Sequence, residues 1–523
     1  MRRACLTFTS LMGLVLAVAC APVPAVQTSN TADPVAEQQP DPARIPVNGV
    51  EFPVVTRHQG VFNGRRVSYT ATVGALDIAD AEGNPGARIV STSYVADPEP
   101  GVADSEPGVA KRPVLFVWNG GPISPSVYLH MGAFGPKRVA FPDDLLSDPV
   151  TAPLVDNPHS ILDVVDLVYF DPAGTGFSRT LPGKPLEDYF SIAADAQQTA
   201  AFIAAWLQSN GRADSPAYVF GESYGTNRAV ETADQLAQLP KPILLDGVVL
   251  FGQAVNIIEY AQRPLNIISY VVSLPTLAAI GWYHGKANHR GADLEAFVES
   301  AWQYAQTDYL DALFQGNTLP PERMLEVAER LEQFTGLSSE VFVEKRLRVS
   351  KEAYRVELFK DEGLVIGRSD GRYVGPAQSE GAEAGTAPPD PAEGLPRALA
   401  EAFRAYLVSD LGLPSAQEYL TDSPVKGLDD WDWKDHTPFA QFAYGDALNA
   451  LLEKNPRARV LVAAGHFDTM TTTGASRYLL NQATWPQERA TLKTYRGGHM
   501  AYSIEESARE LAEDLRALVA IAQ

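Results

Sequence analysis

Cysteine is almost absent from this chain of 523 residues, in which only Cys5 and Cys20 occur. Cys5 lies within an expected export signal, so the mature chain would keep at most one thiol and could form no internal disulfide. Cysteine pairs for a structural zinc are missing and the eight histidines lack ligand spacing, so we expect neither a metal nor a cofactor. The 45% of hydrophobic residues is ordinary for a globular protein, and we expect the hydrophobic core alone to stabilise the fold.

Positive charge is also scarce. The chain has 42 Lys and Arg against 64 Asp and Glu, which gives a formal net charge of -22. An acidic surface of this kind favours solubility and argues against nucleic acid or anionic lipid as a main partner. Beyond the N-terminus, no apolar run is long enough to span a bilayer.

The N-terminus has the features of an export signal over residues 1–20. Arg2 and Arg3 precede an apolar run that is too short for a comfortable membrane span. Small residues before Cys20 resemble a bacterial lipoprotein signal, in which the cysteine is lipidated; the alternative is an ordinary cleaved signal with an incidental cysteine. Both interpretations predict export, to the periplasm or as a lipid-anchored envelope protein. Residues 21–45, rich in Pro, Ala, Thr, Asp and Gln, are expected to form a flexible tether.

Alternating and continuous apolar segments predict an α/β fold. The alternation between residues 50 and 95 predicts antiparallel strands, and the continuous runs predict buried strands separated by helices. This order indicates a mostly parallel central sheet with helices on both faces, the α/β-hydrolase fold. The buried strands are predicted at 113–118, 164–170, 217–220, 243–251, 458–464 and 491–495, and the helices at 191–209, 226–238 and 503–521.

The core is predicted in two parts, residues 46–255 and 431–523. Residues 256–430 lie between these two parts. Their first part has a mainly helical pattern and more aromatic residues than the core, which indicates an inserted helical cap. Within this insertion, residues 375–396 are poor in bulky apolar side chains and rich in Gly, Ala, Pro and Glu, so we expect a mobile loop there.

A Gly-x-Ser-x-Gly pattern spans residues 221–225, with Ser223 at its centre. It follows a predicted strand and precedes a predicted helix, the context in which a sharp turn exposes a nucleophilic serine above the sheet. The helix N-terminus beneath it favours developing negative charge. Out of this context, such a serine could equally lie in a tight turn without any chemical role.

A serine nucleophile needs a base, and the base needs an orienting acid. In α/β-hydrolases the acid and then the histidine follow the serine along the chain, each after a late strand. Asp468 and His499 hold these positions, which predicts the triad Ser223–Asp468–His499. His466 is expected to have a supporting or surface role. The remaining candidates lack a strand-end context and are expected to be solvated or hydrogen-bonded: His284, His289 and His436.

Several segments in sequence order resemble the serine carboxypeptidase family. They run from about residue 111 to the C-terminus, apart from the cap, and their collinearity is more specific than any single motif. The segments are Trp118-Asn119-Gly120-Gly121-Pro122, Gly135-Pro136, Asn157-Pro158-His159-Ser160, Asp171-Pro172-Ala173-Gly174-Thr175-Gly176-Phe177-Ser178, the serine turn, Gly465 with Asp468, and Gly498-His499-Met500.

This resemblance implies a function and further site residues. It implies an exported serine-type carboxypeptidase that hydrolyses C-terminal peptide bonds of a peptide substrate through an acyl-enzyme. The backbone N–H groups of Gly121 and Tyr224 would form the oxyanion hole. Asn119 and Glu222 would bind the free C-terminal carboxylate, with Trp118 supporting Asn119. This binding requires a protonated Glu222, because two like charges at hydrogen-bond distance repel each other.

The sequence departs from the family pattern at three positions. Ile123 replaces a glycine, Ser124 replaces a frequent cysteine, and Ala133 replaces the second carboxylate of the substrate site. Without that carboxylate, the pKa of Glu222 should be raised less, which keeps an esterase or acyltransferase with the same triad as an alternative. A β-branched residue at position 123 would distort the oxyanion loop if a positive φ were needed there, so a third hypothesis is a catalytically weak binding protein of the cell envelope.

Overall fold

The computed structural model describes residues 45–47, 49–80, 83–98, 111–142, 145, 149–378, 388–433 and 443–522. The predicted signal with Cys20 lies outside these residues, as do the predicted tether up to residue 44 and His436. In the described part of the chain, no helix is long and apolar enough to cross a membrane.

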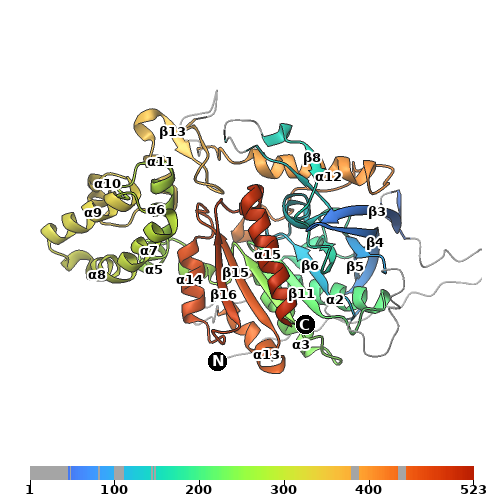
Figure 1. The fold of residues 1–523 in the computed structure, drawn as a ribbon. Helices are drawn as coiled ribbons and strands as arrows, with labels where there is room; N and C mark the ends of the chain where they lie inside the picture. The colour runs from blue at the N-terminus through green and yellow to red at the C-terminus, as the bar shows by residue number, and fades with distance from the viewer. Residues whose placement is uncertain are drawn as a thin grey trace, which may run out of the picture. The chain divides into compact units, whose positions relative to one another are not determined.

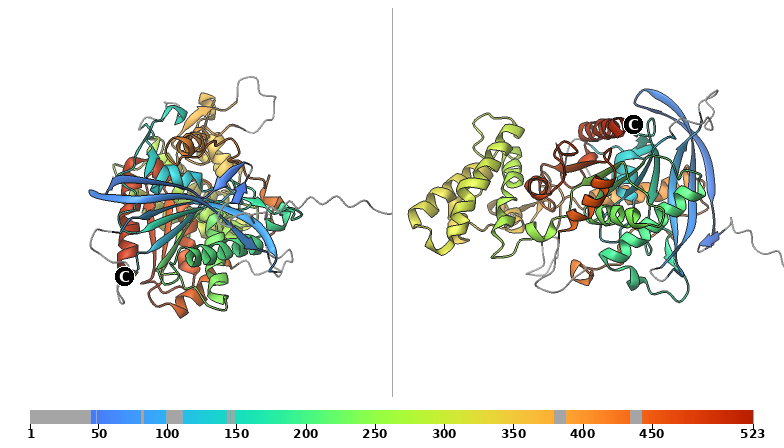
Figure 2. Two further views of the ribbon diagram at one scale, coloured as in Figure 1. Left: turned by 90° about the vertical axis from the view of Figure 1, so that its right-hand side faces the viewer. Right: turned by 90° about the horizontal axis from the view of Figure 1, so that it is seen from below.

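A mixed sheet of ten strands forms the centre of the fold (Figures 1 and 2). Six neighbouring strands are parallel, and three long strands continue the sheet in antiparallel order, with a short strand beside β5. In spatial order they are β16 (Ala490–Tyr495), β15 (Arg459–Gly465), β12 (Gly247–Phe251), β11 (Ala217–Glu222), β6 (Val114–Trp118), β9 (Asp166–Phe170), β5 (Pro85–Ala96), β4 (Arg65–Ala79) and β3 (Val54–Phe62), with β10 (Arg179–Thr180) beside β5.

Side chains alternate between the two faces of the sheet and enter two separate hydrophobic cores. In β11, Tyr218 and Phe220 enter one core, whereas Ala217 and Val219 enter the other. Helices α12 (Gly394–Ser409) and α15 (Glu505–Ala522) contribute to the first core. The second core is covered by α2 (Ile192–Ser209), α3 (Gly225–Gln238) and α13 (Ala447–Lys454). The sheet therefore has helices on both faces, and the predicted α/β-hydrolase fold is confirmed.

A helical insertion follows β12 and has a hydrophobic core of its own. In Figure 1 its green and yellow helices gather beside α14 (Thr473–Gln482), and α6 packs against α14. The insertion contains α4 (Ile257–Tyr260), α5 (Ile267–Val271), α6 (Leu274–Tyr283), α7 (Leu294–Tyr304), η4 (Ala305–Tyr309), α8 (Leu310–Gln315), η5 (Gly316–Thr318), α9 (Pro321–Thr335), α10 (Ser339–Glu344), α11 (Lys351–Glu357), η6 (Lys360–Glu362) and the hairpin β13 (Leu364–Ile366) and β14 (Val374–Pro376).

The cap is shorter than the predicted range 256–430. Helix α12 lies within that range, but its residues Leu399 and Phe403 belong to the core cluster of the sheet. Tyr419 joins the same cluster, and Val425 joins the cluster on the opposite face. The helical pattern of α12 does not reveal which hydrophobic surface it covers, so sequence alone assigned it to the cap.

The ends of the predicted mobile loop 375–396 are regular structure. Strand β14 extends to Pro376 and α12 begins at Gly394, while residues 379–387 lie outside the described part. Asp390 accepts hydrogen bonds from the backbone N–H groups of Arg368, Ser369 and Ala392. The segment after residue 387 is therefore anchored despite its loop-like composition.

Shorter elements complete the described chain. They are β1 (Ile45–Val47) paired with β2 (Val50–Phe52), β7 (Lys137–Val139) paired with β8 (Leu154–Asp156), α1 (Val127–Leu129), the π-helical turn η1 (His130–Phe134), η2 (Pro149–Thr151), η3 (Leu186–Tyr189), η7 (Leu428–Asp430), η8 (Tyr444–Asp446) and η9 (Ala501–Ser503).

Candidate active site

Ser223 lies in the turn between β11 and α3 with a backbone φ of 58°. A positive φ is strained for a residue with a side chain, and here the surrounding backbone enforces it. The Ser223 N–H donates to the carbonyl of Phe251 at 2.9 Å, which ties the turn to β12. A Cβ atom on Gly221 would lie 2.1 Å from the carbonyl oxygen of Gly225, so only glycine at 221 permits so tight a turn.

Asp468 and His499 form a hydrogen-bonded pair at the ends of two neighbouring strands. His499 Nδ1 lies 2.7 Å from Asp468 Oδ2, and both side chains are buried. The other carboxylate oxygen accepts the backbone N–H groups of Met470 and Thr471 at 2.7 and 3.1 Å, which orients the acid. Burial lowers the pKa of His499, but the charge and hydrogen bond of Asp468 outweigh burial and raise the pKa to about 9.

The histidine ring reaches the serine turn. An ideal Cβ atom on Gly252 would lie 3.1 Å from His499 Cε1, and Gly252 directly follows Phe251, the register partner of Glu222. The ring therefore lies across the ends of β11 and β12, where Ser223 leaves the sheet. No hydrogen bond joins Ser223 Oγ to His499 among the described contacts; such bonds are often long without substrate and tighten when it binds.

The loop after β6 packs directly against the serine turn. A Cβ atom on Gly120 would lie 2.6 Å from the backbone nitrogen of Tyr224, so only a glycine allows this approach. Among the described residues, the backbone N–H groups of Gly121 and Tyr224 have no protein acceptor. Two unpaired donors on neighbouring loops form the arrangement that an oxyanion hole requires. In the same loop Ile123 has a φ of 53° and is fully buried, so a β-branched residue does occupy a left-handed conformation there.

Asn119 and Glu222 meet in a buried site beside the serine turn. Asn119 Nδ2 donates to Glu222 Oε2 at 2.5 Å, and Tyr502 donates its hydroxyl to the same oxygen at 2.9 Å. Burial raises the pKa of Glu222 to about 7, although His499 and the hydrogen bonds to the carboxylate oppose the shift. Burial therefore raises this pKa without a second acid at Ala133.

A buried ion pair between α2 and α3 holds the backbone of Asn119 in place. Arg228 on α3 pairs with Asp195 on α2 at 2.9 Å, and both side chains are fully buried. The guanidinium also donates to the backbone carbonyl of Asn119 at 2.9 Å. The indole of Trp118 donates to the carbonyl of Gly225 at 2.8 Å, so its described hydrogen bond braces the serine turn rather than the side chain of Asn119.

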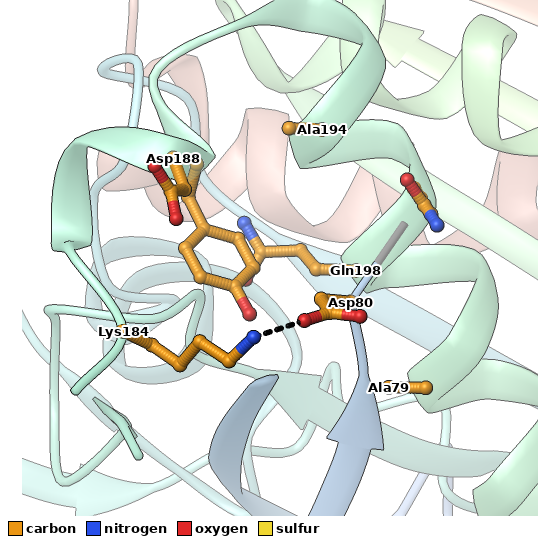
Figure 3. A pocket seen from close by; sticks show the side chains of 8 residues that line it. Ala79, Asp80, Lys184, Asp188, Ala194 and Gln198 are labelled. Carbon is orange, nitrogen blue, oxygen red and sulfur yellow. Dashed lines mark hydrogen bonds and ion pairs between the residues drawn. The ribbon is translucent and has the colours of Figure 1, made fainter. Parts of the chain in front are cut away.

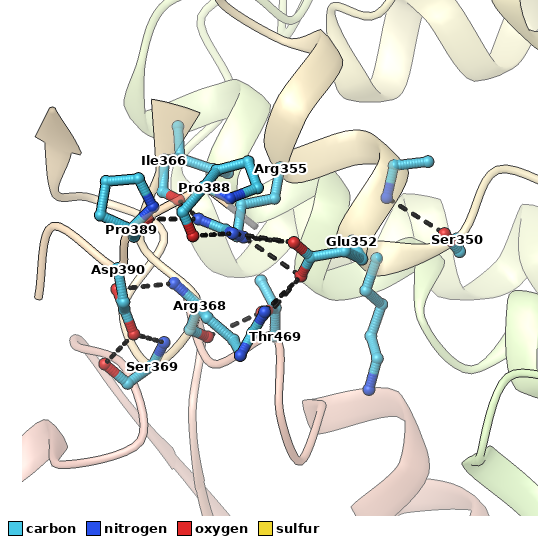
Figure 4. Close-up of polar contacts among 12 residues, drawn as sticks. Ser350, Glu352, Arg355, Ile366, Arg368, Ser369, Pro388, Pro389, Asp390 and Thr469 are labelled. Atoms are coloured by element: carbon cyan, nitrogen blue, oxygen red, sulfur yellow. Dashed lines mark hydrogen bonds and ion pairs between the residues drawn. The ribbon is translucent and has the colours of Figure 1, made fainter. Parts of the chain in front are cut away.

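A loop from the cap, residues 367–373, contacts the loops that carry Asp468 and His499, and Figure 4 shows its contact with Thr469 in the Asp468 loop. The carbonyl of Ser369 accepts the backbone N–H of His499 at 2.6 Å, and the carboxylate of Asp370 accepts that of Gly498 at 3.1 Å. Thr469, in the acid loop, donates its hydroxyl to the carbonyl of Arg368 at 2.7 Å. The backbone positions of the histidine and acid loops therefore depend on a loop of the cap.

The base of this cap loop is held by a second network, also drawn in Figure 4. The buried guanidinium of Arg355 donates to the carbonyls of Ile366, Pro388 and Pro389 and to the carboxylate of Glu352. One planar side chain therefore connects α11, the β13 hairpin and the segment leading to α12.

The other candidate histidines have no contact with the triad among the described hydrogen bonds. His466 is buried and its pKa is lowered to about 4 by burial, which keeps the ring neutral. His284 Nε2 lies 2.8 Å from the carbonyl of Gly371. No cluster of three His, Cys, Asp or Glu able to hold a metal occurs in the described part of the chain.

A separate cavity of about 350 Å³ lies elsewhere in the molecule (Figure 3). It lies between the end of β4 and α2 and contains the ion pair of Lys184 with Asp80 at 2.5 Å. None of the predicted site residues lines it.

Comparison with known proteins shows which proteins the chain is similar to. A model of the serine carboxypeptidase family matches residues 102–250, the segment that carries the Asn119 loop and the serine turn. A prohormone-processing carboxypeptidase from Saccharomyces cerevisiae, Kex1(delta)p, has a similar solved structure, with a TM-score of 0.53 and 13% identity over 86% of this chain and 91% of its own. A proline iminopeptidase from Mycobacterium smegmatis matches with a TM-score of 0.32 and 14% identity over 86% of this chain and 100% of its own. No curated protein sequence matches the chain.

The predicted resemblance to the serine carboxypeptidase family is thus confirmed over residues 102–250, and the Kex1(delta)p structure supports the fold. With the α/β-hydrolase fold, it supports a serine hydrolase, the class of enzyme that the sequence predicted.

Sequence analysis missed three contributors to the site: Tyr502, the Arg228–Asp195 pair and the cap loop around Ser369. Tyr502 follows the His499 motif closely, so a polar side chain there offered a weak signal. The other two contact the site mainly through its backbone N–H and carbonyl groups, and such contacts leave no residue-type pattern in a sequence.

Proposed function

We propose that the protein is an exported serine-type carboxypeptidase that cleaves C-terminal peptide bonds through Ser223, Asp468 and His499. The observation that carries this proposal is the buried contact of Asn119 with Glu222 beside the serine turn. A neutral carboxyl and an amide at this place suit a substrate that ends in a free carboxylate. An ordinary esterase has no need for such a site.

The reaction would proceed in two halves. Ser223 Oγ attacks the scissile carbonyl carbon while His499 Nε2 accepts the hydroxyl proton, and the N–H groups of Gly121 and Tyr224 stabilise the oxyanion. The C–N bond then breaks, and His499 returns the proton to the departing amine. Water, deprotonated by His499, attacks the acyl-enzyme, and the acid product leaves as Ser223 regains its proton.

Burial of Glu222 supports the exopeptidase assignment. With its pKa raised to about 7 by burial, the side chain is mainly protonated below pH 7 and can donate to a carboxylate there. Asn119 is already positioned at the same point by its contact with the backbone N–H of Leu129 at 3.1 Å. A substrate without a free C-terminus would lose both interactions.

Paired substrates test the proposal. A blocked dipeptide with a free C-terminus should be cleaved at least about 100-fold more efficiently than its amide, because two positioned hydrogen bonds to a charged group are lost. Ser223→Ala should abolish both turnover and labelling by a fluorophosphonate probe. Equal cleavage of the free acid and the amide would favour an esterase or acyltransferase, and an unlabelled Ser223 in the native protein would favour a binding protein.

We also propose that export ends in lipidation of Cys20, on the basis of the signal-like residues 1–20 and the polar residues 21–45. Radiolabelled fatty acid should be incorporated into the native chain and not into Cys20→Ser. Release of the native chain without label would support the ordinary cleaved signal.

A further inference from the structure

Tyr502 donates a hydrogen bond to Glu222 and packs against the turn that carries Ala133. It lies in η9, shortly after His499, and its side chain is fully buried. A Cβ atom on Gly132 would lie 2.5 Å from Tyr502 Cε2, so the ring covers the π-helical turn η1 where only a glycine leaves room. Ala133, the residue in place of the expected acid, is the next residue of this turn.

The two hydrogen bonds to Glu222 define where its proton resides. Asn119 Nδ2 and the hydroxyl of Tyr502 both donate to Oε2. An oxygen that accepts two donors is a poor place for a third hydrogen, so a neutral Glu222 carries its proton on Oε1. Among the described residues Oε1 has no hydrogen-bond partner, which leaves it available to a ligand.

We propose that Tyr502 is a specificity-determining residue that replaces the missing acid: its hydroxyl fixes Glu222 so that the Oε1 proton points to the C-terminal carboxylate of the substrate. The inference rests on the proposed carboxypeptidase function. It explains how the site can lack a second carboxyl and still bind a carboxylate, since a phenol supplies the hydrogen bond without an additional negative charge.

The consequence concerns pH. The groups that interact with Glu222 are Asn119, Tyr128 from α1, Asp468, and His499 and Tyr502 from the segment before α15. Burial raises the pKa of Tyr128 to about 12 and that of Tyr502 well above its ordinary value, so both phenols keep their protons in the working range. Carboxylate binding is then governed by the single proton of Glu222, whereas two acids would share a proton between them.

Tyr502→Phe tests the proposal, because it removes only the hydroxyl. We expect KM for the free-acid dipeptide to rise about tenfold, while kcat and the kinetics of the matched amide or ester stay within about twofold. Because the hydrogen bond from Tyr502 lowers the pKa of Glu222, its loss should also move the alkaline rise in KM to higher pH. Tyr495→Phe, which removes a hydroxyl bound to Asp514 at 2.8 Å, is the matched control and should change neither KM nor its pH dependence.

A fluorinated tyrosine at position 502 provides the opposite perturbation. Its more acidic hydroxyl is a stronger donor, so the alkaline rise in KM should move to lower pH, and this readout remains if the phenylalanine variant fails to fold. An unchanged KM and pH profile in both variants, or equal losses with free and amidated substrates, would overturn the role of Tyr502. If the native enzyme does not discriminate between the free acid and the amide, the proposed function itself fails.

Discussion

Glu222 is a buried carboxyl whose described side-chain contacts are hydrogen bonds to the neutral groups Asn119 and Tyr502. A charged carboxylate in such surroundings would normally be compensated by a cation, and here the nearest cationic group is His499 once it is protonated. A protonated His499 therefore favours the ionised form of Glu222. This coupling makes pH the most informative variable at the scale of single residues.

Glu222→Gln should remove the alkaline loss of affinity. In the native enzyme, KM for free-acid substrates should rise about tenfold per pH unit above pH 7, because the pKa of Glu222 is raised to about 7 and an ionised Glu222 repels the substrate carboxylate. Glutamine remains neutral and keeps a donor, so KM should stay level from pH 6 to 9. The amide substrate depends on His499 and not on carboxylate binding, so its profile provides the reference. A persistent alkaline rise in the Gln variant would assign the effect to another group.

Ile123 tests whether the oxyanion loop is impaired. Its positive φ costs about 1–2 kcal/mol, whereas its buried side chain stabilises the fold by about 2–4 kcal/mol. Ile123→Gly should therefore lower the free energy of unfolding by about 1–2 kcal/mol and leave kcat within about threefold. Denaturant unfolding and steady-state kinetics measure the two quantities. A large gain in kcat would show that isoleucine distorts the loop, in agreement with a catalytically weak native protein.

At the scale of elements, the cap loop 367–373 is expected to position His499. Asp390 accepts hydrogen bonds from Ser369 N and Oγ, each at 3.2 Å, and Ser369 in turn accepts the backbone N–H of His499. Asp390→Asn replaces one acceptor oxygen by a donor, so Ser369 should lose its anchor. We expect kcat to fall about tenfold for both free and amidated substrates, with their ratio unchanged.

The matched control for this prediction is another aspartate of the inserted helical region. Asp293 caps α7 by accepting the backbone N–H of Ala296 at 2.8 Å, and asparagine caps helices equally well. Asp293→Asn should therefore leave kcat and thermal stability unchanged. If Asp390→Asn behaves like this control, the cap loop does not position His499.

Elements with a strong local pattern could be predicted from the sequence, and long-range contacts could not. The apolar runs that end in glycine correspond to β6, β11 and β15, and the serine turn lies where the pattern placed it. Residues 243–246 precede β12 as a loop although their composition continues that of the strand. Tyr502 is 280 residues from Glu222 along the chain, and α12 covers the sheet rather than the cap. The Tyr502–Glu222 contact and the position of α12 both depend on which surfaces pack together in the folded chain. Local periodicity in the sequence does not encode this packing.

At the scale of the whole molecule, the strongest electrostatic feature is the net charge of -22. Repulsion between surface carboxylates opposes the compact state and is screened by salt, since exposed charges interact over about one Debye length. The ion pairs inside the core respond differently. Arg228–Asp195 is fully buried, and Asp166, itself buried, is paired with both Arg112 and Arg212. Such pairs are screened much less than surface charges.

Moderate salt should therefore stabilise this protein rather than weaken it. Raising NaCl from about 10 to 150 mM reduces the surface repulsion while the buried pairs persist, so Tm should rise by about 2–5 °C. Differential scanning calorimetry of the mature chain measures the shift, and KCl at the same ionic strength should give the same value if screening is the cause. A Tm that falls with salt would contradict this prediction. It would show that exposed ion pairs, such as Arg477–Glu299, stabilise the fold more than the repulsion between surface carboxylates destabilises it.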